Sequence, residues 1–261
     1  MIWNQDPELI KIGSLSIRWY GFLFALGIYL GSEMAKFVKN KAGDLNFDID
    51  KLFIFVVAGT FFGARLGHCL FYEPDIYLAD PARIFFVWEG GLASHGALIG
   101  VIISLFVFSK VYKVEFLRLC DLLAAPACFA GGMIRLGNLF NSEIIGNQTT
   151  VPWAVIFSRI DPYPRHPTQL YESIFYFMLC IALSFYIKKK NYHLKIGQTF
   201  GFYLLGTFVF RFCIEFLKIP QVNFERDMSL NMGQLLSLPL IAIGVYFAFF
   251  FVQSKTKTKS K

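Results

Sequence analysis

Seven long apolar runs alternate with short polar segments along this chain. They cover residues 17–37, 52–72, 91–109, 117–140, 168–187, 198–216 and 231–252. Each is close to the roughly 20 residues that a helix needs to cross the hydrocarbon core of a bilayer. The pattern therefore predicts an all-α integral membrane protein with seven transmembrane helices, folded as a single membrane domain over residues 1–261.

The composition supports a membrane protein and argues against a nucleic-acid-binding protein. Hydrophobic residues make up 56% of the chain and charged residues 16%, whereas about a quarter of the residues are charged in a soluble domain. The formal net charge is +7, but the Lys residues gather in short clusters between apolar runs. That distribution is typical of the inner loops of a membrane protein, and we expect no nucleic-acid partner.

The basic loops predict the orientation. Fifteen of the 25 Lys and Arg residues lie in segments 36–51, 110–118, 188–195 and 255–261, which seven spans would place on one side. The positive-inside rule makes this side cytoplasmic, with the N-terminus outside. The first 15 residues lack a basic start followed by an apolar core, so we expect no cleavable signal. The basic tail, residues 254–261, is expected to lie near anionic lipid heads.

Two segments on the expected outer side are longer than turns. Residues 142–167 contain the apolar piece PWAVIF, which predicts a short strand in a small extracytoplasmic head. Residues 73–89 contain prolines and aromatics, a mixture expected of an interfacial arm.

Residues 131–146, GGMIRLGNLFNSEIIG, carry an unusual concentration of polar groups in an apolar setting. Arg135 and Asn138 are three residues apart and share a helix face, Asn141 continues that row, and Glu143 follows. An arginine at this depth is energetically costly, so it normally faces a partner or a water-filled cavity.

Other spans hold isolated polar residues. Arg65 and His68 share a face of the second span, as part of a structural salt bridge or as an anchor for a lipid headgroup. His95 opens the third span between glycines, which would let backbone or ligand approach its imidazole. Since the pKa of histidine suits proton transfer near neutral pH, we favour a functional role for His95.

The fifth and sixth spans add further candidates. RHPTQLYES leads into the fifth, where Thr168 is a plausible helix start and capping could explain both Thr168 and Glu172. In RFCIEF, Arg211 and Glu215 are four apart. They form either a structural ion pair, or a site in which Arg211 binds an anion and Glu215 orients it.

Three arginines within spans predict an anion site, because the planar guanidinium matches phosphate oxygens. The sequence has no HExxH helix, Walker loop or acidic metal-binding pair, so we expect no metal and no cofactor. The five cysteines form no CxxC pair and are expected to be buried apolar residues. These residues indicate an integral membrane enzyme or carrier for an anionic lipid.

Several motifs resemble the bacterial prolipoprotein diacylglyceryl transferase family. They are YG after Arg18 and Trp19, HGALIG, IRLGNLFNSE, RHPTQLYE, RFCIEF and NMGQLLSLP, in order from Arg18 to Pro239. The resemblance implies a seven-span enzyme of the bacterial inner membrane. It would transfer the diacylglyceryl group of phosphatidylglycerol to the lipobox cysteine of preprolipoproteins, releasing glycerol phosphate.

The resemblance also implies roles for individual residues. His95, Arg135, Arg211, Tyr20 and Glu143 match catalytic positions, with His95 as the candidate base. Arg135, Asn138, Asn141, Gly146, Arg211 and Glu215 would bind substrate. Arg65 lies outside these motifs and is a further substrate-binding candidate because of its place within the second span. His95 could instead position lipid, with Glu143 or hydroxide taking the proton.

The chain departs from the family pattern at two positions. Ala97 and Ile134 stand where the family usually has glycine, and Ile134 could change how the helix packs beside Arg135. A carrier using the same intramembrane arginines is the alternative function, and a structural scaffold is a third.

Overall fold

The computed structural model describes residues 1–13, 15–86, 90–193, 195–219 and 228–251. Within these residues, seven helical segments are long and apolar enough to cross a membrane. They are Trp19–Ala42, Ile49–Phe71, Ser94–Val111, Phe116–Asn141, Thr168–Lys189, Gln198–Leu217 and Met232–Phe250. The number and order of the predicted spans are confirmed. The tail, residues 254–261, and the end of the predicted arm, residues 87–89, lie outside the described residues.

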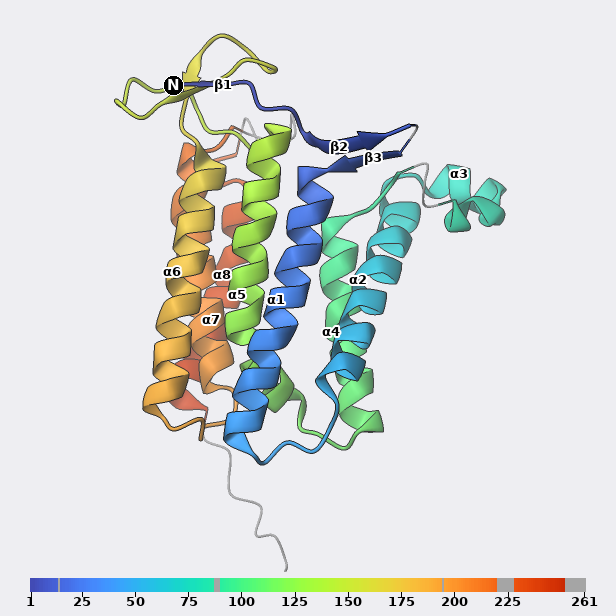
Figure 1. The fold of residues 1–261 in the computed structure, drawn as a ribbon, viewed down its shortest axis with the longest axis vertical. Helices are drawn as coiled ribbons and strands as arrows, with labels where there is room; N and C mark the ends of the chain where they lie inside the picture. The colour runs from blue at the N-terminus through green and yellow to red at the C-terminus, as the bar shows by residue number, and fades with distance from the viewer. Residues whose placement is uncertain (14, 87–89, 194, 220–227, 252–261) are drawn as a thin grey trace, which may run out of the picture. The chain divides into compact units, whose positions relative to one another are not determined.

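The elements follow in the order β1 (Ile2–Trp3), β2 (Glu8–Ile12), β3 (Leu15–Arg18), α1 (Trp19–Ala42), α2 (Ile49–Phe71), α3 (Pro74–Ala79), η1 (Pro81–Phe85), α4 (Ser94–Val111), α5 (Phe116–Asn141), β4 (Val155–Phe157), β5 (Pro164–Arg165), α6 (Thr168–Lys189), α7 (Gln198–Ile214), η3 (Glu215–Leu217), α8 (Met232–Val245) and η5 (Tyr246–Phe250). Figure 1 shows these elements along the chain. The chain divides into two compact units, which are described separately. The first contains residues 1–42 and 120–261, and the second contains residues 43–119.

In the second unit, α2 and α4 pack against each other through glycines. A Cβ atom at Gly63 would meet the backbone of Gly96 and Gly100, and one at Gly67 would lie 2.6 Å from Gly96 Cα. Small residues at such contacts let two helix backbones approach closely, as in membrane helix pairs. Gly96 therefore has a packing role between α2 and α4.

In the first unit, a buried acid joins two helices. Asp121, near the start of α5, accepts hydrogen bonds from the N–H groups of Gly197 at 2.6 Å and Phe200 at 2.8 Å. These amides belong to the first turn of α7, whose unpaired N–H groups favour a carboxylate. The contact stabilises the start of α7 and sets its position beside α5.

The core of this unit lies between α5 and α6. Ala124, Ala125, Cys128, Cys180, Leu183 and Ile187 form one buried cluster there. Four cysteines are buried as expected, but Cys213 is exposed. Its position on the outward face of α7 explains the difference, since an apolar run does not show which of its residues face the bundle.

The head contains a three-stranded sheet in the order β1–β4–β5. β4 confirms the strand predicted from PWAVIF. β1 pairs with β4 in parallel, Ile2 opposite Ile156, and the N-terminal ammonium donates to the Ala154 carbonyl at 3.1 Å. Figure 1 shows this sheet and the N-terminus at the same end of the first unit's helices. The head therefore consists of residues 142–167 together with the N-terminal strand β1. The local sequence pattern did not predict the contribution of this strand.

The first helix begins later than predicted. Residues 15–18 form β3, which pairs antiparallel with β2 as a hairpin. The N–H of Trp19 then donates to the Pro7 carbonyl at 2.9 Å, and α1 starts at Trp19. Ile17 and Arg18 therefore belong to the β-hairpin, although the apolar pattern had assigned them to the first span.

We expect Gly100→Ala to destabilise the second unit by about 1–3 kcal/mol, because it overfills a tight contact. The added Cβ would meet the Gly59 carbonyl and lie 2.9 Å from Gly63 Cα. Gly21→Ala in α1 is the control, since nothing lies within 4 Å of its Cβ position. Thermal unfolding in detergent should show a lower midpoint for Gly100→Ala only. An unchanged midpoint in that variant would contradict the packing role.

Candidate functional site

The polar stripe at the end of α5 folds onto Glu143. Arg135 Nη1 donates to Asn138 Oδ1 at 3.3 Å. Asn138 Nδ2 in turn donates to Glu143 Oε2 at 3.0 Å, and Asn141 Nδ2 donates to Glu143 Oε1 at 3.2 Å. The stretch thus forms one hydrogen-bonded chain from a guanidinium through amides to a carboxylate.

An unusual turn brings Glu143 back toward α5. Ser142 and Ile144 on either side of Glu143 both have φ of 56°, a conformation that side chains disfavour. The Glu143 N–H donates to the Asn138 carbonyl at 2.9 Å. Non-glycine residues hold such angles only where the surroundings compensate, and this commonly occurs at functional sites.

The start of α6 supplies that compensation. Thr168 Oγ1 donates to the Ile144 carbonyl at 2.7 Å, and Gln169 Nε2 donates to the Glu143 carbonyl at 2.5 Å. The helix begins at Thr168 as predicted, but Pro167 is the N-cap and no side chain caps this end. The capping explanation for Thr168 was therefore wrong, because its hydroxyl binds the neighbouring turn instead.

The capping explanation was also wrong for Glu172, which is part of an ionic network. Its side chain is 0% exposed, with Oε2 3.4 Å from Arg135 Nε and Oε1 3.0 Å from Lys218 Nζ. Lys218 Nζ also lies 2.9 Å from Glu215 Oε1. Glu215 Oε1 is 3.9 Å from Arg211 Nε, which completes the network. Arg135 and Arg211 are thus linked through two carboxylates and one lysine.

Neutral groups surround this network. The Tyr176 side chain hydrogen-bonds with Arg135 and lies within electrostatic reach of Arg211. Asn231 Nδ2 donates to Glu215 Oε2 at 3.2 Å from the start of α8. The Arg211–Glu215 ion pair exists as the sequence allowed, but Glu215 is held more tightly by Lys218 and Asn231 than by Arg211.

Tyr20 and Gly146 lie in the same unit as the network. The Tyr20 ring packs on Gly137, where a Cβ would lie 2.8 Å from it, and its hydroxyl is within electrostatic reach of Glu143 and Arg135. The Gly146 N–H donates to the His166 carbonyl at 3.0 Å. A Cβ on Gly146 would lie 2.6 Å from that oxygen, so glycine is required for the contact.

Ile134 does not disturb the network. α5 runs without interruption through this position to Asn141, and Arg135 keeps its contacts with Asn138 and Glu172. Ile134 is thus compatible with both contacts of Arg135.

In the second unit, Arg65 is 2% exposed and bonds to backbone carbonyls. Its donors reach the carbonyl oxygens of Arg83, Ile84, Phe86, Gly90 and Gly91. The guanidinium also lies over the Tyr77 ring, 5.0 Å from its centre. Because these groups occupy its donors, the structure favours a structural role for Arg65 in the arm over the predicted contact with substrate.

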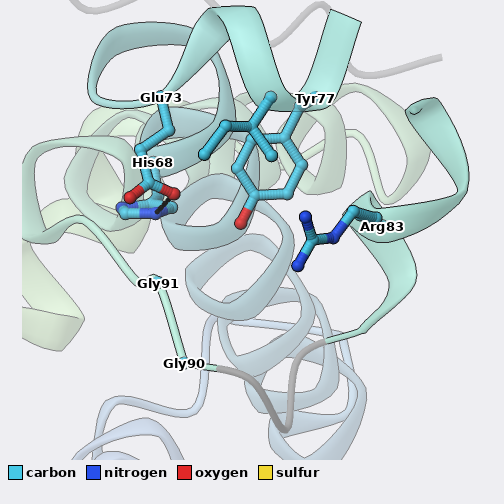
Figure 2. A pocket seen from close by; sticks show the side chains of 7 residues that line it. His68, Glu73, Tyr77, Arg83, Gly90 and Gly91 are labelled. Carbon is cyan, nitrogen blue, oxygen red and sulfur yellow. Dashed lines mark hydrogen bonds and ion pairs between the residues drawn. The ribbon is translucent and has the colours of Figure 1, made fainter. Parts of the chain in front are cut away.

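The elements α3 and η1 form the arm, and a cavity of about 420 Å³ lies beside it (Figure 2). The cavity is lined by His68, Glu73, Ile76, Tyr77, Arg83, Gly90 and Gly91. His68 Nε2 lies 3.2 Å from Glu73 Oε2, and Figure 2 shows the two side chains facing each other. His68 thus pairs with Glu73, which supports the structural alternative for this residue.

His95 is the second residue of α4, and it is exposed within its own unit. The sequence motifs pointed to His95 but did not single out Lys218 as a site residue. They also missed Tyr176. The nearest available signal was spacing, because Lys218 follows Glu215 by three residues and Tyr176 follows Glu172 by four.

These elements define a multi-pass membrane protein whose intramembrane polar groups gather into an arginine–carboxylate network. A model of the prolipoprotein diacylglyceryl transferase family matches residues 7–250, and the chain belongs to this family.

Relatives match nearly the whole chain. A protein of Chloroherpeton thalassium is 44% identical over 254 residues, which cover 95% of this chain and 93% of that protein. A protein of Tolumonas auensis is 42% identical over 258 residues, 98% of this chain and 100% of its own length. A protein of Bacteroides fragilis is 42% identical over 97% of this chain and 96% of its own. All three are named phosphatidylglycerol–prolipoprotein diacylglyceryl transferase.

We expect the head to lose stability at acid pH through Asp161. Arg165 Nε donates to both oxygens of this carboxylate, at 3.1 and 3.0 Å, and these bonds hold the pKa of Asp161 below its usual range. The resulting stabilisation is present above the unfolded pKa of about 3.9 and is lost as pH falls through the lower folded pKa. Hydrogen exchange of residues 155–165 between pH 6 and pH 3 should show this loss.

Asp161→Asn should reduce that pH dependence. Asp6→Asn is the matched control, because the Asp6 carboxylate accepts the N–H of Glu8 at 2.8 Å, and it should keep the wild-type profile. Equal profiles for wild type and Asp161→Asn would refute the role of this ion pair.

Proposed function

We propose that this chain transfers the diacylglyceryl group of phosphatidylglycerol to the lipobox cysteine thiol of a preprolipoprotein. The cysteine sulfur attacks the glyceryl carbon, a C–S bond forms, and the C–O bond to phosphate breaks. The thiol proton passes to a base, and glycerol phosphate leaves with the electron pair of the broken bond. This is the first step of bacterial lipoprotein maturation.

The observation that carries the proposal is the pair of arginines in one network. Glu172, Lys218 and Glu215 connect Arg135 to Arg211 through ion pairs of 2.9 to 3.9 Å, so the two guanidinium groups belong to one site of the first unit. The Arg211 side chain is 35% exposed and lies 3.9 Å from its carboxylate, so it can bind a further anion. Fixed guanidinium groups stabilise a phosphate that gains charge as it leaves.

The residues around the arginines have supporting roles in the proposal. Asn138 and Asn141 hold Glu143, which would orient substrate or take a proton. Glu215 orients Arg211, and Tyr20 and Gly146 shape the site. His95 is proposed as the base for the thiol. The nucleophile comes from the substrate, so the enzyme's own cysteines have no role in this chemistry.

We further propose that the protein resides in the bacterial inner membrane with its N-terminus outside and its C-terminus in the cytoplasm. The head would then meet exported preprolipoproteins, and the arm would lie at the interface. Support comes from the basic segments around Lys39 and Lys188, which follow the positive-inside rule.

Arg135→Ala should lower product formation by at least about 100-fold, because a charge that stabilises the leaving phosphate is lost. The assay incubates purified protein with phosphatidylglycerol and a lipobox peptide and measures the diacylglyceryl thioether by mass spectrometry. Arg118→Ala is the control, since Arg118 pairs with Asp44 in the other unit. This variant should stay within about twofold of wild type, because surface ion pairs contribute little.

The same assay separates the enzyme from a carrier. A carrier would move phosphatidylglycerol between vesicle leaflets without forming a thioether. If wild type gives no thioether, or Arg135→Ala forms as much as wild type, the transferase proposal is rejected.

His95→Gln should lower kcat by about 10²–10⁴-fold while phosphatidylglycerol still binds, because only proton transfer is removed. His193→Gln, at an exposed loop position, is the matched control and should leave turnover unchanged. Turnover at the wild-type rate in His95→Gln would exclude His95 as the base and leave Glu143 as the next candidate.

A further inference from the structure

Lys218 lies at the centre of the ionic network. Its side chain is 5% exposed, and its Nζ reaches Glu172 on α6 at 3.0 Å and Glu215 on η3 at 2.9 Å. Each of these carboxylates also faces one of the two arginines. Lys218 is therefore the cation that both carboxylates share.

The backbone fixes Lys218 in this place. Its N–H donates to the Glu215 carbonyl at 3.3 Å, and it pairs with Gly146 in an isolated β-bridge. The Asn147 N–H also donates to the Leu217 carbonyl at 2.7 Å. The loop that follows Glu143 thus holds the segment that carries Lys218.

The direct ion pairs of the network hold more cations than carboxylates. Among the described residues of the first unit, they join three cations, Arg135, Arg211 and Lys218, to two carboxylates, Glu172 and Glu215. Glu143 reaches Arg135 only through the Asn138 amide, so it forms no direct ion pair here. The direct pairs therefore leave one cation in excess, and Arg211 is the most exposed of the three at 35%. At low dielectric such an excess is costly without an anion, and it attracts one strongly.

We propose that Lys218 is a positioning residue that keeps one cation in excess among the directly paired groups of this network, so that the arginines bind the phosphate of the lipid. The inference rests on the proposed function. Without Lys218, two carboxylates would face two arginines, and each guanidinium would be neutralised by its own acid. With Lys218, the carboxylates are shared, and the surplus charge is available to the substrate phosphate.

A purely structural role for Lys218 makes a different prediction. Removing one member of a buried ion pair generally destabilises a protein, whatever the substrate. Such a loss would lower the unfolding temperature without selectively weakening phosphate binding in the folded protein. The test therefore needs the affinity for an anion as well as turnover.

The experiment compares three variants with wild type. They are Lys218→Met, Lys218→Arg and a double variant that carries both Lys218→Met and Glu172→Gln. The full-length protein is purified in detergent, and folding is checked by thermal unfolding. Two quantities are measured, the KM for phosphatidylglycerol in the thioether assay and the affinity for glycerol phosphate by calorimetry. If Lys218→Met does not fold, Lys218→Gln replaces it, since its amide can still donate to the carboxylates.

We expect Lys218→Met to weaken glycerol phosphate binding and to raise KM by about tenfold, with a smaller change in kcat. Lys218→Arg should retain both values, because it keeps the charge. The double variant restores one surplus cation and should recover most of the lost affinity. Unchanged glycerol phosphate affinity in folded Lys218→Met, or a double variant no better than the single one, would overturn the proposal.

The two proposals fail in distinguishable ways. Absence of thioether with wild type rejects the transferase reaction, while the glycerol phosphate affinities still test the charge of the network. An active wild type whose affinity does not depend on Lys218 rejects the positioning role and leaves the transferase function intact.

Discussion

The burial of Glu172 is the constraint on which the rest of the site depends. A carboxylate with 0% exposure is strongly destabilising unless cations reach it. The two cations come from different segments, Arg135 from α5 and Lys218 from the position directly after η3. Three parts of the chain must therefore meet at one point before this charge is satisfied. Such a requirement sets the relative positions of α5, α6 and η3 more narrowly than apolar packing alone would.

The turn after α5 is a second consequence of this arrangement. Ser142 and Ile144 accept an unfavourable backbone conformation, and Thr168 and Gln169 stabilise it from the start of the helix that carries Glu172. The path of the loop then brings Gly146 beside Lys218. The signature stretch and the ionic network are thus parts of one folded element, in which backbone strain is offset by side chains of α6.

The structure distinguishes arginines that look alike in the sequence. Arg65, Arg135 and Arg211 all lie within apolar runs, and each was a candidate for binding the lipid headgroup. Arg65 is 2% exposed and bonds to backbone carbonyls of its own unit, whereas the Arg211 side chain is 35% exposed and 3.9 Å from its acid. Glycines show the same contrast. Gly96 beside His95 packs on Gly63 and Gly67 of α2, whereas nothing lies within 4 Å of a Cβ position at Gly21 in α1.

The sequence by itself determined the seven spans, the strand in PWAVIF and the shared face of Arg135 and Asn138, because these depend on local periodicity and composition. It also identified the family through its ordered motifs. Tertiary structure alone decided that the N-terminus adds a strand to the head, that Arg65 serves the arm, and that Lys218 bridges Glu172 and Glu215. The contact between Lys218 and Glu172 joins residues 46 positions apart in the chain. No periodic pattern extends over that distance, so partners for a buried charge become visible only once the helices are packed.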